Sequence, residues 1–550
     1  MTPDDAPWWH RTVIYQIYPR SFADSDGDGI GDLLGIVSKL DYLVELGVGT
    51  LWVSPFFDSP QRDFGYDVRN YREVAPEYGT LDDADRLIRE SHERGLHVMF
   101  DLVLNHTSDT HPWFVESATR RDGPKSDWYI WADPKAGVGR RRPNNWRNAM
   151  EIGRPWVWND QRQQYYLATF LPFQPDLNWR NHEVRDEMFD TVRFWLDRGV
   201  DGFRLDIFGD IMKTEGLPNN KIRPAVRDGF PGISAKEHQR NTPDNVQLAI
   251  DLRTTCRSVE TPERDEPVLL GEVFGPPGTL KQYQADGDGL QLVFLFDFLT
   301  YRYDASWMRD TISRYEREFP FPSQPTYVLE NHDRSRTIDR VQGDVNKAKV
   351  LAAILLTVRG VPTIYFGQEL GMSNTSIPWD RAKDPIAAEV FGWLPAVVAD
   401  RLPERLNRDE MRTPMQWDHT ANAGFCSAGV SPWLPVNANS RQRNVADEHV
   451  DPESMLNWYR SLLALRSSRE ALHSGRLDVM ASCPPNVLGY VRSTAHERIA
   501  IVVNLGDATA KVSLGSRASV MVTSTDGNVL SESALSVEMR PHSATVLELH

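Results

Sequence analysis

The sequence predicts an α/β fold, a (β/α)₈ TIM barrel with an inserted domain after strand three and a C-terminal antiparallel β-sandwich. Three observations predict it. Eight short apolar runs alternate with helical patterns, as in a parallel barrel. The third and fourth runs are separated by a long segment rich in Trp, Pro, Asn and Arg. The end of the chain holds short β-prone runs divided by turn residues.

The eight predicted barrel strands are short apolar runs of the kind buried in parallel sheets. They cover 13–18, 50–53, 97–104, 202–205, 268–273, 292–298, 325–329 and 361–366. Helical patterns cover 33–46, 81–94 and 184–198. Eight such units favour a closed barrel over an open sheet. No glycine-rich phosphate fingerprint follows the first run, which weighs against a nucleotide-binding fold.

The spacing of these elements predicts three domains. A segment as long as 107–177 needs structure of its own, so we interpret it as an inserted domain. The barrel is then assigned to 1–106 and 178–472, and the β-sandwich to 473–550. Within the barrel we expect a second insert at about 374–420 and a helix at 455–472. Strands of the sandwich are expected at 487–491, 499–504, 518–523 and 544–550.

Composition limits the partners. The formal net charge is −16 and the sequence pI is about 5.4, which argues against nucleic acid and anionic membranes. The three cysteines, Cys256, Cys426 and Cys483, are far apart and form no zinc pattern, which favours a reducing compartment. The first ten residues lack the features of a signal peptide. We therefore expect a cytoplasmic protein with a small-molecule substrate, no membrane partner and no organic cofactor; the oligomeric state stays open.

Polar side chains gather where the predicted strands end. The third strand is associated with Asp101, Asn105 and His106, the fourth with Arg204 and Asp206, the fifth with Glu272, and the seventh with Asn331, His332 and Asp333. Active residues of such barrels sit at these C-terminal strand ends. Carboxylates from three strands would meet at one mouth, and glycoside cleavage needs one carboxylate to attack and one acid to protonate the leaving oxygen.

Seven segments carry a resemblance to a known family. DLVLNH (101–106), GFRLD (202–206), GEVF (271–274) and ENHD (330–333) resemble, in order, the signature of the α-amylase family, glycoside hydrolase family 13. QPDLN (174–178), DFGYDVRNY (63–71) and RTPMQWD (412–418) resemble the oligo-1,6-glucosidases and related α-glucosidases. The resemblance implies a retaining, exo-acting α-glucosidase that hydrolyses short α-glucosides of maltose, isomaltose or sucrose type through a covalent glucosyl–Asp206 intermediate.

The same resemblance implies a role for each site residue. Asp206 is the nucleophile, Glu272 the general acid/base, and Asp333 the carboxylate that stabilises the oxocarbenium-like transition state. Arg204 lies two residues from Asp206 on a strand, hence on the same side, and would keep it ionised. The implied substrate-binding residues are Asp63, Tyr66, His106, Phe170, Arg204, His332 and Arg412. Among them, Asp63 and Arg412 would pair to close the pocket around the terminal glucose.

The loop DSDGDGIGD (24–32) has the composition of a cation site. Acidic side chains at alternate positions with intervening glycines suit a hard cation. An EF-hand is not favoured, because Gly35 occupies the position of its closing glutamate. The family resemblance places a structural Ca²⁺ (or Mg²⁺) here, with oxygens from Asp24, Asp26, Asp28, Asp32 and the Ile30 carbonyl.

Several alternatives stay open at this stage. A transglucosidase would use the same covalent intermediate, and a sucrose isomerase or a trehalose-6-phosphate hydrolase is a more distant alternative. A catalytically dead binding protein on the same scaffold is opposed by the intact Asp206, Glu272 and Asp333. Ile207 occupies a position linked to bond preference in the family, and it leaves α-1,4 and α-1,6 specificity undecided.

Overall fold

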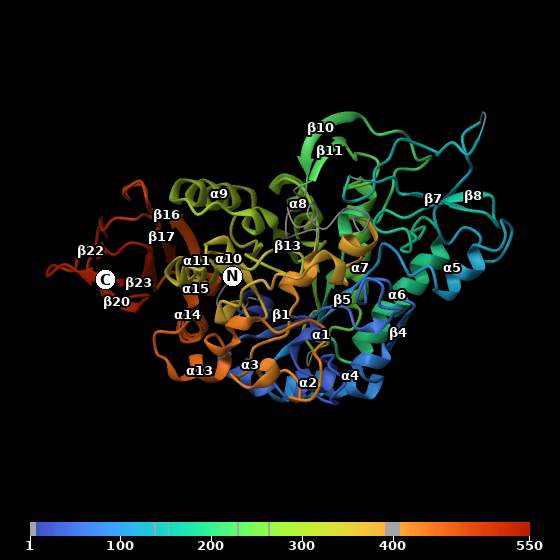
Figure 1. The fold of residues 1–550 in the computed structure, drawn as a ribbon. Coiled ribbons are helices and arrows are strands. Elements are labelled where there is room, and N and C mark those ends of the chain that lie inside the picture. The colour runs from blue at the N-terminus through green and yellow to red at the C-terminus, as the bar shows by residue number, and fades with distance from the viewer. Residues whose placement is uncertain (1–6, 137–138, 152, 228–229, 262–263, 391–406) are drawn as a thin grey trace. The chain divides into compact units, whose positions relative to one another are not determined.

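The computed structural model describes residues 7–136, 139–151, 153–227, 230–261, 264–390 and 407–550 (Figure 1). Eight parallel strands close a barrel in the order β1-β15-β14-β13-β12-β9-β5-β2. The strands are β1 (Ile14–Ile17), β2 (Thr50–Val53), β5 (His97–Leu102), β9 (Gly202–Leu205), β12 (Val268–Gly271), β13 (Leu292–Leu295), β14 (Thr326–Val328) and β15 (Val361–Tyr365). The predicted fold class is confirmed, and each predicted strand contains the observed one.

By compactness the chain divides into two units. The first comprises Met1–Trp52, Arg89–His97 and Phe294–His550, and the second Val53–Ile88 and Val98–Val293. Each unit holds part of the barrel sheet and is described by itself below. The predicted second insert, 374–420, belongs to the first unit, and its residues 391–406 lie outside the described residues.

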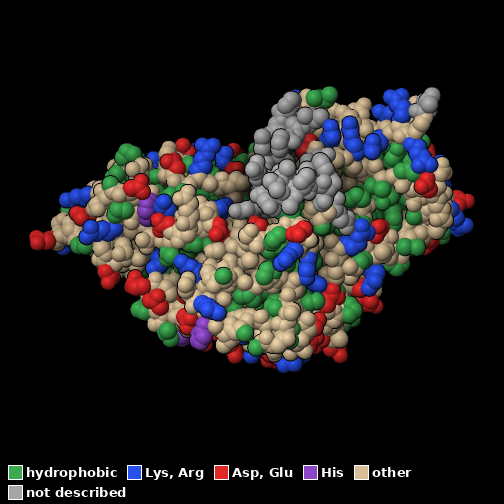
Figure 2. Space-filling view, in the orientation of Figure 1, with side chains coloured by type: hydrophobic (Ala, Val, Ile, Leu, Met, Phe, Trp, Pro, Cys, Tyr) green, Lys and Arg blue, Asp and Glu red, His purple; other side chains and the backbone are tan. Residues whose placement is uncertain are grey.

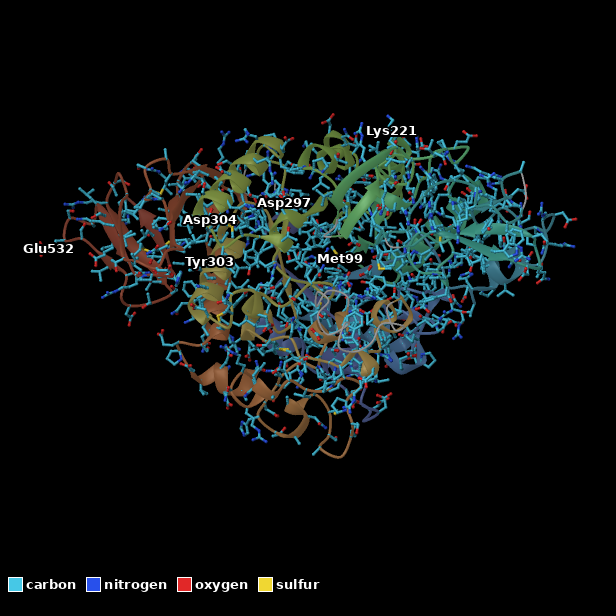
Figure 3. The ribbon with its side chains drawn as sticks, turned by 45° about the horizontal axis from the view of Figure 1, so that its top comes forward. Met99, Lys221, Asp297, Tyr303, Asp304 and Glu532 are labelled. Atoms are coloured by element: carbon cyan, nitrogen blue, oxygen red, sulfur yellow. The ribbon has the colours of Figure 1, made fainter. Side chains whose placement is uncertain are left out.

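In the first unit, side-chain capping fixes where helices begin. Helix α9 (Ala305–Glu318) starts at Asp304, whose carboxylate accepts from the Trp307 backbone N–H at 2.7 Å. Asp297, beyond β13, accepts from the Tyr315 hydroxyl at 2.7 Å and so ties the strand to the helix that follows it. Figure 3 labels both aspartates. The helices α11 (Val345–Thr357) and α14 (Met455–Ser468) pack against each other in the same unit.

Two predicted helices are each broken in two. The pattern at 33–46 folds as α2 (Leu33–Val37) and α3 (Leu40–Leu46), because the Ser38 hydroxyl donates to the Gly35 carbonyl at 2.7 Å and competes with the helical hydrogen bonds. The pattern at 455–472 folds as α14 and α15 (Glu470–Ser474), divided at Arg469, whose backbone is extended. The apolar periodicity of the sequence continues through both breaks, so the sequence pattern did not reveal them.

The C-terminal part of the first unit is a two-sheet sandwich. Its larger sheet has the order β16-β17-β18-β23-β20 and the smaller β19-β22-β21. The strands are β16 (Arg476–Val479), β17 (Val487–Ser493), β18 (Arg498–Asn504), β19 (Ala510–Ser513), β20 (Ala518–Thr523), β21 (Val529–Leu530), β22 (Ser536–Met539) and β23 (Ser543–Leu549). Buried Val502 and Leu547 of one sheet share a core with Val537 and Met539 of the other, as expected of a sandwich.

The second unit contains the inserted sheet expected after strand three. Its order is β6-β8-β7, formed by Trp131–Ala132, Gln164–Leu167 and Trp156–Asn159. Buried Trp146, Trp156 and Tyr165 pack beneath it. The unit also holds α4 (Leu81–Glu93), α6 (His182–Asp197), α7 (Pro243–Arg257), α8 (Pro277–Tyr283) and the hairpin of β10 (Ile222–Arg227) and β11 (Phe230–Ser234).

The surface is of mixed charge. On the face shown in Figure 2, basic and acidic side chains are interspersed rather than gathered by sign. Among the described residues, no helix combines the length and apolarity needed to cross a bilayer. The ends of the barrel strands position the candidate site described next.

Candidate active site

In the second unit the site is built around one buried arginine. Asp101 on β5 and Arg204 on β9 are register partners, so their side chains meet inside the barrel. Arg204 is 2% exposed, and its Nη1 donates to Asp101 Oδ1 at 2.9 Å and to Asp206 Oδ1 at 2.8 Å. Its Nη2 donates to Glu272 Oε2 at 2.5 Å. One guanidinium thus holds three carboxylates from three neighbouring strands.

The cluster holds more carboxylates than cations. Asp101, Asp206 and Glu272 outnumber the single Arg204 cation, and all four side chains are buried. Burial raises the pKa of the Asp206 carboxyl, the Arg204 guanidinium opposes the rise, and the charges on Glu272 and Asp101 add to it. Arg204 therefore acts in the expected direction on Asp206, but burial among like charges outweighs it.

The residue after Asp206 has an unusual backbone. Ile207 has a φ of 33°, in the left-handed region that a β-branched residue rarely adopts. This turn directs the Ile207 backbone N–H to Glu272 Oε2 at 3.1 Å. Glu272 thus accepts two hydrogen bonds at the same oxygen, from Ile207 and Arg204, which fixes its carboxyl group beside that of Asp206.

The DFGYDVRNY segment (63–71) contributes two of the predicted binding residues. Asp63 is 2% exposed, and its Oδ2 accepts from Gln174 Nε2, of the QPDLN segment, at 2.9 Å. The Tyr66 hydroxyl donates to Asp101 Oδ2 at 3.2 Å, so Tyr66 joins the Arg204 cluster. Asp67 accepts from the Asp63 backbone N–H at 3.0 Å, and burial raises its pKa to about 7. These contacts hold Asp63 and Tyr66 in one rigid loop.

His106 and Phe170 are placed in the same unit. Burial lowers the pKa of His106 to about 4, so its ring is neutral near pH 7. Its Nδ1 accepts from Asn105 Nδ2 at 3.2 Å, and its Nε2 donates to the Tyr66 carbonyl at 3.2 Å. Phe170 is half-buried, next to Thr169, which donates to Asp176. The predicted roles of His106 and Phe170 toward glucose remain predictions.

A second charged cluster, in the first unit, has the opposite charge pattern. Asp333, beyond β14, receives Arg412 Nη2 at 2.8 Å and Arg408 Nη1 at 3.2 Å on the same oxygen. Its side chain is 34% exposed, whereas Arg412 is fully buried. Burial opposes ionisation, but the charges of His332, Arg408 and Arg412 outweigh it and hold the pKa of Asp333 well below its usual range. These cations therefore favour the ionised form of Asp333.

His332 is fixed by the first strand. Gln16 Nε2, on β1, lies 2.7 Å from His332 Nδ1, and the Arg412 side chain donates to the His332 carbonyl at 2.8 Å. The other ring nitrogen, Nε2, lies 3.5 Å from Asp333 Oδ2. Tyr18 stacks on His332 with ring centroids 6.1 Å apart. The predicted residues His332, Asp333 and Arg412 are thus brought together.

Sequence reasoning missed several residues that hold these groups. Arg408 lies four residues before Arg412 and forms a bidentate ion pair with Asp384. Its Nη2 donates to Asp384 Oδ1 at 2.8 Å and its Nε to Asp384 Oδ2 at 3.0 Å. Gln16 and Tyr18 lie at the C-terminal end of β1, and Gln174 lies within QPDLN. Reading the end of the first strand as closely as the others would have found Gln16 and Tyr18. Arg408 begins a single 3-10 turn, Arg408–Met411, which is too short to give such a signal.

The acidic loop has a partial fit to a hard cation. Carboxylate oxygens of Asp24, Asp26 and Asp28 lie within 4.8 Å of one another, which suits oxygen ligation. Asp32 uses its oxygens within the chain: it accepts from the Ser25 backbone N–H at 2.7 Å and caps α2 through the Gly35 N–H at 2.7 Å. Three of the predicted ligands therefore converge, and the fourth predicted aspartate, Asp32, caps helix α2.

Comparison with known proteins agrees with this barrel. Residues 16–475 match the model of the α-amylase catalytic domain. The chain is 38% identical over 522 residues to a probable alpha-glucosidase of Rhizobium meliloti, covering 92% of this chain and 91% of the relative. It is 36% identical over 527 residues to the oligo-1,6-glucosidase of Parageobacillus thermoglucosidasius, covering 91% of both chains.

A solved structure shows the same architecture. The crystal structure of the alpha-glucosyl transfer enzyme XgtA superposes with a TM-score of 0.90 at 36% identity, covering 99% of this chain and 100% of the other. The fold and the strand-end carboxylates define a glycoside-hydrolase barrel. The chain belongs to the α-amylase family and is an enzyme of that family.

Proposed function

We propose that the enzyme is a retaining, exo-acting α-glucosidase that hydrolyses short α-glucosides. The observation that carries the proposal is the Arg204 cluster, in which one guanidinium holds Asp206 and Glu272 at 2.8 and 2.5 Å. A retaining glycosidase needs its two carboxyl groups near each other, about 5–5.5 Å apart. The names of the relatives, alpha-glucosidase and oligo-1,6-glucosidase, support the same substrate class.

In the first step of the proposed reaction, an Asp206 oxygen attacks C1 of the terminal glucose. The C1–O bond to the leaving group breaks, and the departing oxygen takes a proton from Glu272. The product is a glucosyl ester of Asp206. Glu272 is assigned as the proton donor because its carboxyl group belongs to the same Arg204 cluster as Asp206. Arg204 and the Ile207 N–H keep Glu272 aligned.

In the second step, ionised Glu272 takes a proton from water, and the water oxygen attacks C1. The ester bond to Asp206 breaks, which returns the carboxylate and releases glucose in the α configuration. Asp333, held anionic by Arg408 and Arg412, is assigned to the positive charge that develops on the sugar ring and to its hydroxyl groups. Asp63 and Arg412 are assigned to the terminal glucose.

A second candidate function is glucosyl transfer. A sugar or alcohol would replace water in the second step, with the same covalent intermediate. The structural similarity to XgtA, an alpha-glucosyl transfer enzyme, favours keeping it. Hydrolysis and transfer share every residue named above, and the fate of the intermediate distinguishes them.

The deciding experiment is product analysis after separate incubation with maltose, isomaltose, sucrose and soluble starch. We expect glucose from at least one of the disaccharides, with little action on starch. Early release of mixed oligosaccharides from starch would show an open cleft and overturn the exo assignment. Glucosylated sugars accumulating at high maltose, with little free glucose, would establish transfer.

The proposal extends to the metal and the compartment. Asp24, Asp26 and Asp28 would hold Ca²⁺ (or Mg²⁺) as a structural ion, with Ile30 and Asp32 as the further predicted ligands. Such an ion would neutralise the converging carboxylates and stabilise the folded chain. Cytoplasmic localisation stays a prediction from the cysteine content, and cell fractionation would test it.

A further inference from the structure

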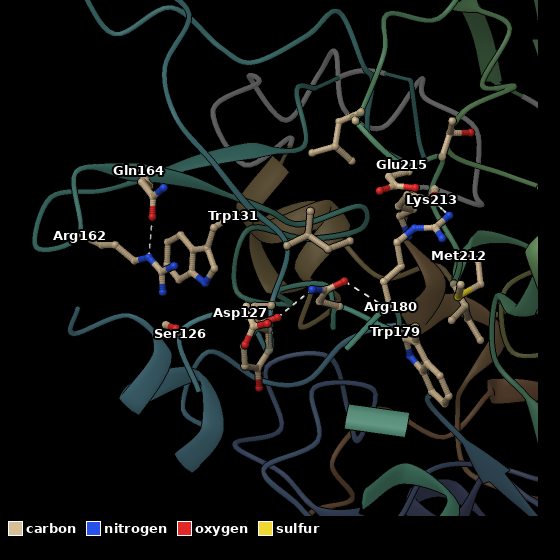
Figure 4. Close-up of a pocket in the computed structure, with 17 residues that line it drawn as sticks. Ser126, Asp127, Trp131, Arg162, Gln164, Trp179, Arg180, Met212, Lys213 and Glu215 are labelled. Carbon is tan, nitrogen blue, oxygen red and sulfur yellow. Dashed lines mark hydrogen bonds between the residues drawn. The ribbon is translucent and has the colours of Figure 1, made fainter. Parts of the chain in front are cut away.

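A cavity lies in the second unit, lined by the inserted sheet and by the loop that follows β9 (Figure 4). Its volume is about 330 Å³, at the low end of the range of small-molecule sites. We propose that this cavity binds a neutral saccharide of one or two sugar units, separately from the catalytic reaction. The proposed function enters only in the choice of an α-glucoside as the ligand.

The cavity has two walls that come from distant parts of the sequence. One wall carries Trp131, Arg162 and Gln164, from and beside strands β6 and β8. The other carries Lys213 and Glu215, in the loop after β9 (Figure 4). A ligand between the walls would therefore bridge the inserted sheet and the loop that starts at Asp206, and its binding would stiffen both.

The lining offers donors and acceptors together, which matches sugar hydroxyls. Each hydroxyl can donate one hydrogen bond and accept two, so a sugar uses carboxylates and cations alike. Glu215 is exposed and makes no hydrogen bond or ion pair among the described residues, and Asp127 is exposed on the same cavity. Arg180 provides donors nearby. The carboxylates of Asp127 and Glu215 would repel an anion, so this lining does not suit an anionic ligand.

Arg162 and Trp131 form the platform of the first wall. The guanidinium carbon of Arg162 lies 4.2 Å from the Trp131 ring centroid, and Arg162 is 7% exposed. Its Nε donates to Gln164 Oε1 at 2.6 Å and its Nη1 to the Ser117 carbonyl at 2.6 Å. These bonds hold the stack rigid. Phe114 also stacks on Trp131, with ring centroids 5.8 Å apart, so the indole faces are packed and its partly exposed remainder adds apolar surface to the cavity.

The cavity is connected to a predicted binding residue. The Lys213 ammonium, which is buried, lies 2.8 Å from Asp176 Oδ2 and donates to Asn105 Oδ1 at 2.9 Å. Asn105 in turn donates to His106 Nδ1 at 3.2 Å. Occupation of the cavity would fix Lys213 and, through Asn105, the orientation of His106. We therefore expect a saccharide in the cavity to change the apparent KM for the substrate.

The test uses maltose and isothermal titration of the full-length Asp206→Asn variant, in which turnover is blocked. We expect two binding events, and only one after adding Glu215→Ala, whose cavity affinity should fall about tenfold with the loss of a charged acceptor. Glu260→Ala, an exposed glutamate of the same unit outside the cavity, is the matched control. Trp131→Ala should act like Glu215→Ala, whereas Trp158→Ala, whose indole also stacks on an arginine in the same sheet, should not.

Crystals of Asp206→Asn soaked in maltose give the second measurement. Sugar density between Trp131 and Glu215 supports the proposal. Maltose at the catalytic residues alone, or a second event unchanged by Glu215→Ala, overturns it. Displacement of maltose from the cavity by inorganic phosphate would mark an anion site and overturn it too. Sugar in the cavity of an enzyme that hydrolyses no α-glucoside would instead overturn the proposed function and leave the cavity site standing.

Discussion

The two charged clusters, one in each unit, are opposite in charge. In the second unit, one cation, Arg204, faces the three carboxylates Asp101, Asp206 and Glu272, which we call the first cluster. In the first unit, one carboxylate, Asp333, faces the two cations Arg408 and Arg412, which we call the second cluster. Burial and neighbouring carboxylates raise the pKa of Asp206, whereas neighbouring cations lower the pKa of Asp333. The first cluster suits nucleophilic attack and proton transfer, and the second suits a fixed negative charge.

The largest effect is predicted for replacing the proposed acid, Glu272, in the first cluster. Glu272→Gln should lower kcat for maltose or isomaltose about 100- to 10,000-fold, because the leaving oxygen is no longer protonated. α-Glucosyl fluoride needs no acid to release fluoride, so its bond cleavage should be far less affected. Steady-state rates with both substrates measure the difference. Equal loss with both substrates would show that Glu272 is not the acid.

A smaller effect is expected in the second cluster. Arg408→Gln should lower kcat/KM about 10- to 100-fold and move the acid limb of its pH profile to higher pH. The sign follows from the lowered pKa of Asp333: the wild-type carboxylate stays ionised as the pH falls, and losing one cation lets it protonate earlier. The pH profile of Arg381→Gln, an exposed arginine of the same unit, should match wild type. A wild-type kcat/KM in Arg408→Gln, or an acid limb moved to lower pH, would contradict the role assigned to Asp333.

A smaller effect than in either cluster is expected from the hydrogen bond that supports Asp63. Gln174→Ala removes the 2.9 Å hydrogen bond to Asp63 and should raise KM about fivefold, with kcat nearly unchanged. Gln282→Ala, on the surface of α8, is the control. Initial rates over a range of maltose concentrations provide both constants. A fall in kcat with unchanged KM would place Asp63 in the chemical step rather than in ground-state binding.

The smallest effect on rate is expected for the metal loop, which belongs to neither cluster. Chelation with EDTA should lower Tm, because an ion bound only by the folded chain stabilises it. Initial rates well below Tm should stay within about twofold of the untreated enzyme. Scanning calorimetry and rate assays on one sample test both statements. Loss of activity while the chain stays folded would contradict a structural role.

Much of the fold and of the first cluster could be predicted from the sequence, for a physical reason. Buried parallel strands are continuous apolar runs, so their ends, and with them Asp206 and Glu272, can be read directly. The contact of Asp101 with Arg204 follows once the register is known. Helix breaks at Ser38 and Arg469 were invisible, because apolar periodicity continues through them.

The second cluster was less predictable. Arg412 was found only through its resemblance to a family motif. Arg408 begins a single 3-10 turn, Arg408–Met411, and Asp384 lies outside any helix or strand, so no period places their side chains. The positive φ of Ile207 is likewise absent from any pattern, because tertiary contacts impose it on a residue that disfavours it. Motif resemblance names such residues, and only coordinates show which charges they meet.

The central claim is a retaining mechanism with Asp206 as nucleophile, and proton NMR of the first product tests it most directly. The fresh enzyme is mixed with an α-glucoside that it cleaves, and the anomeric signals are recorded before mutarotation. The account predicts α-glucose first, with the β signal growing only at the mutarotation rate. β-Glucose as the first product would mean direct attack by water, and the assignment of Asp206 as a covalent nucleophile would be wrong.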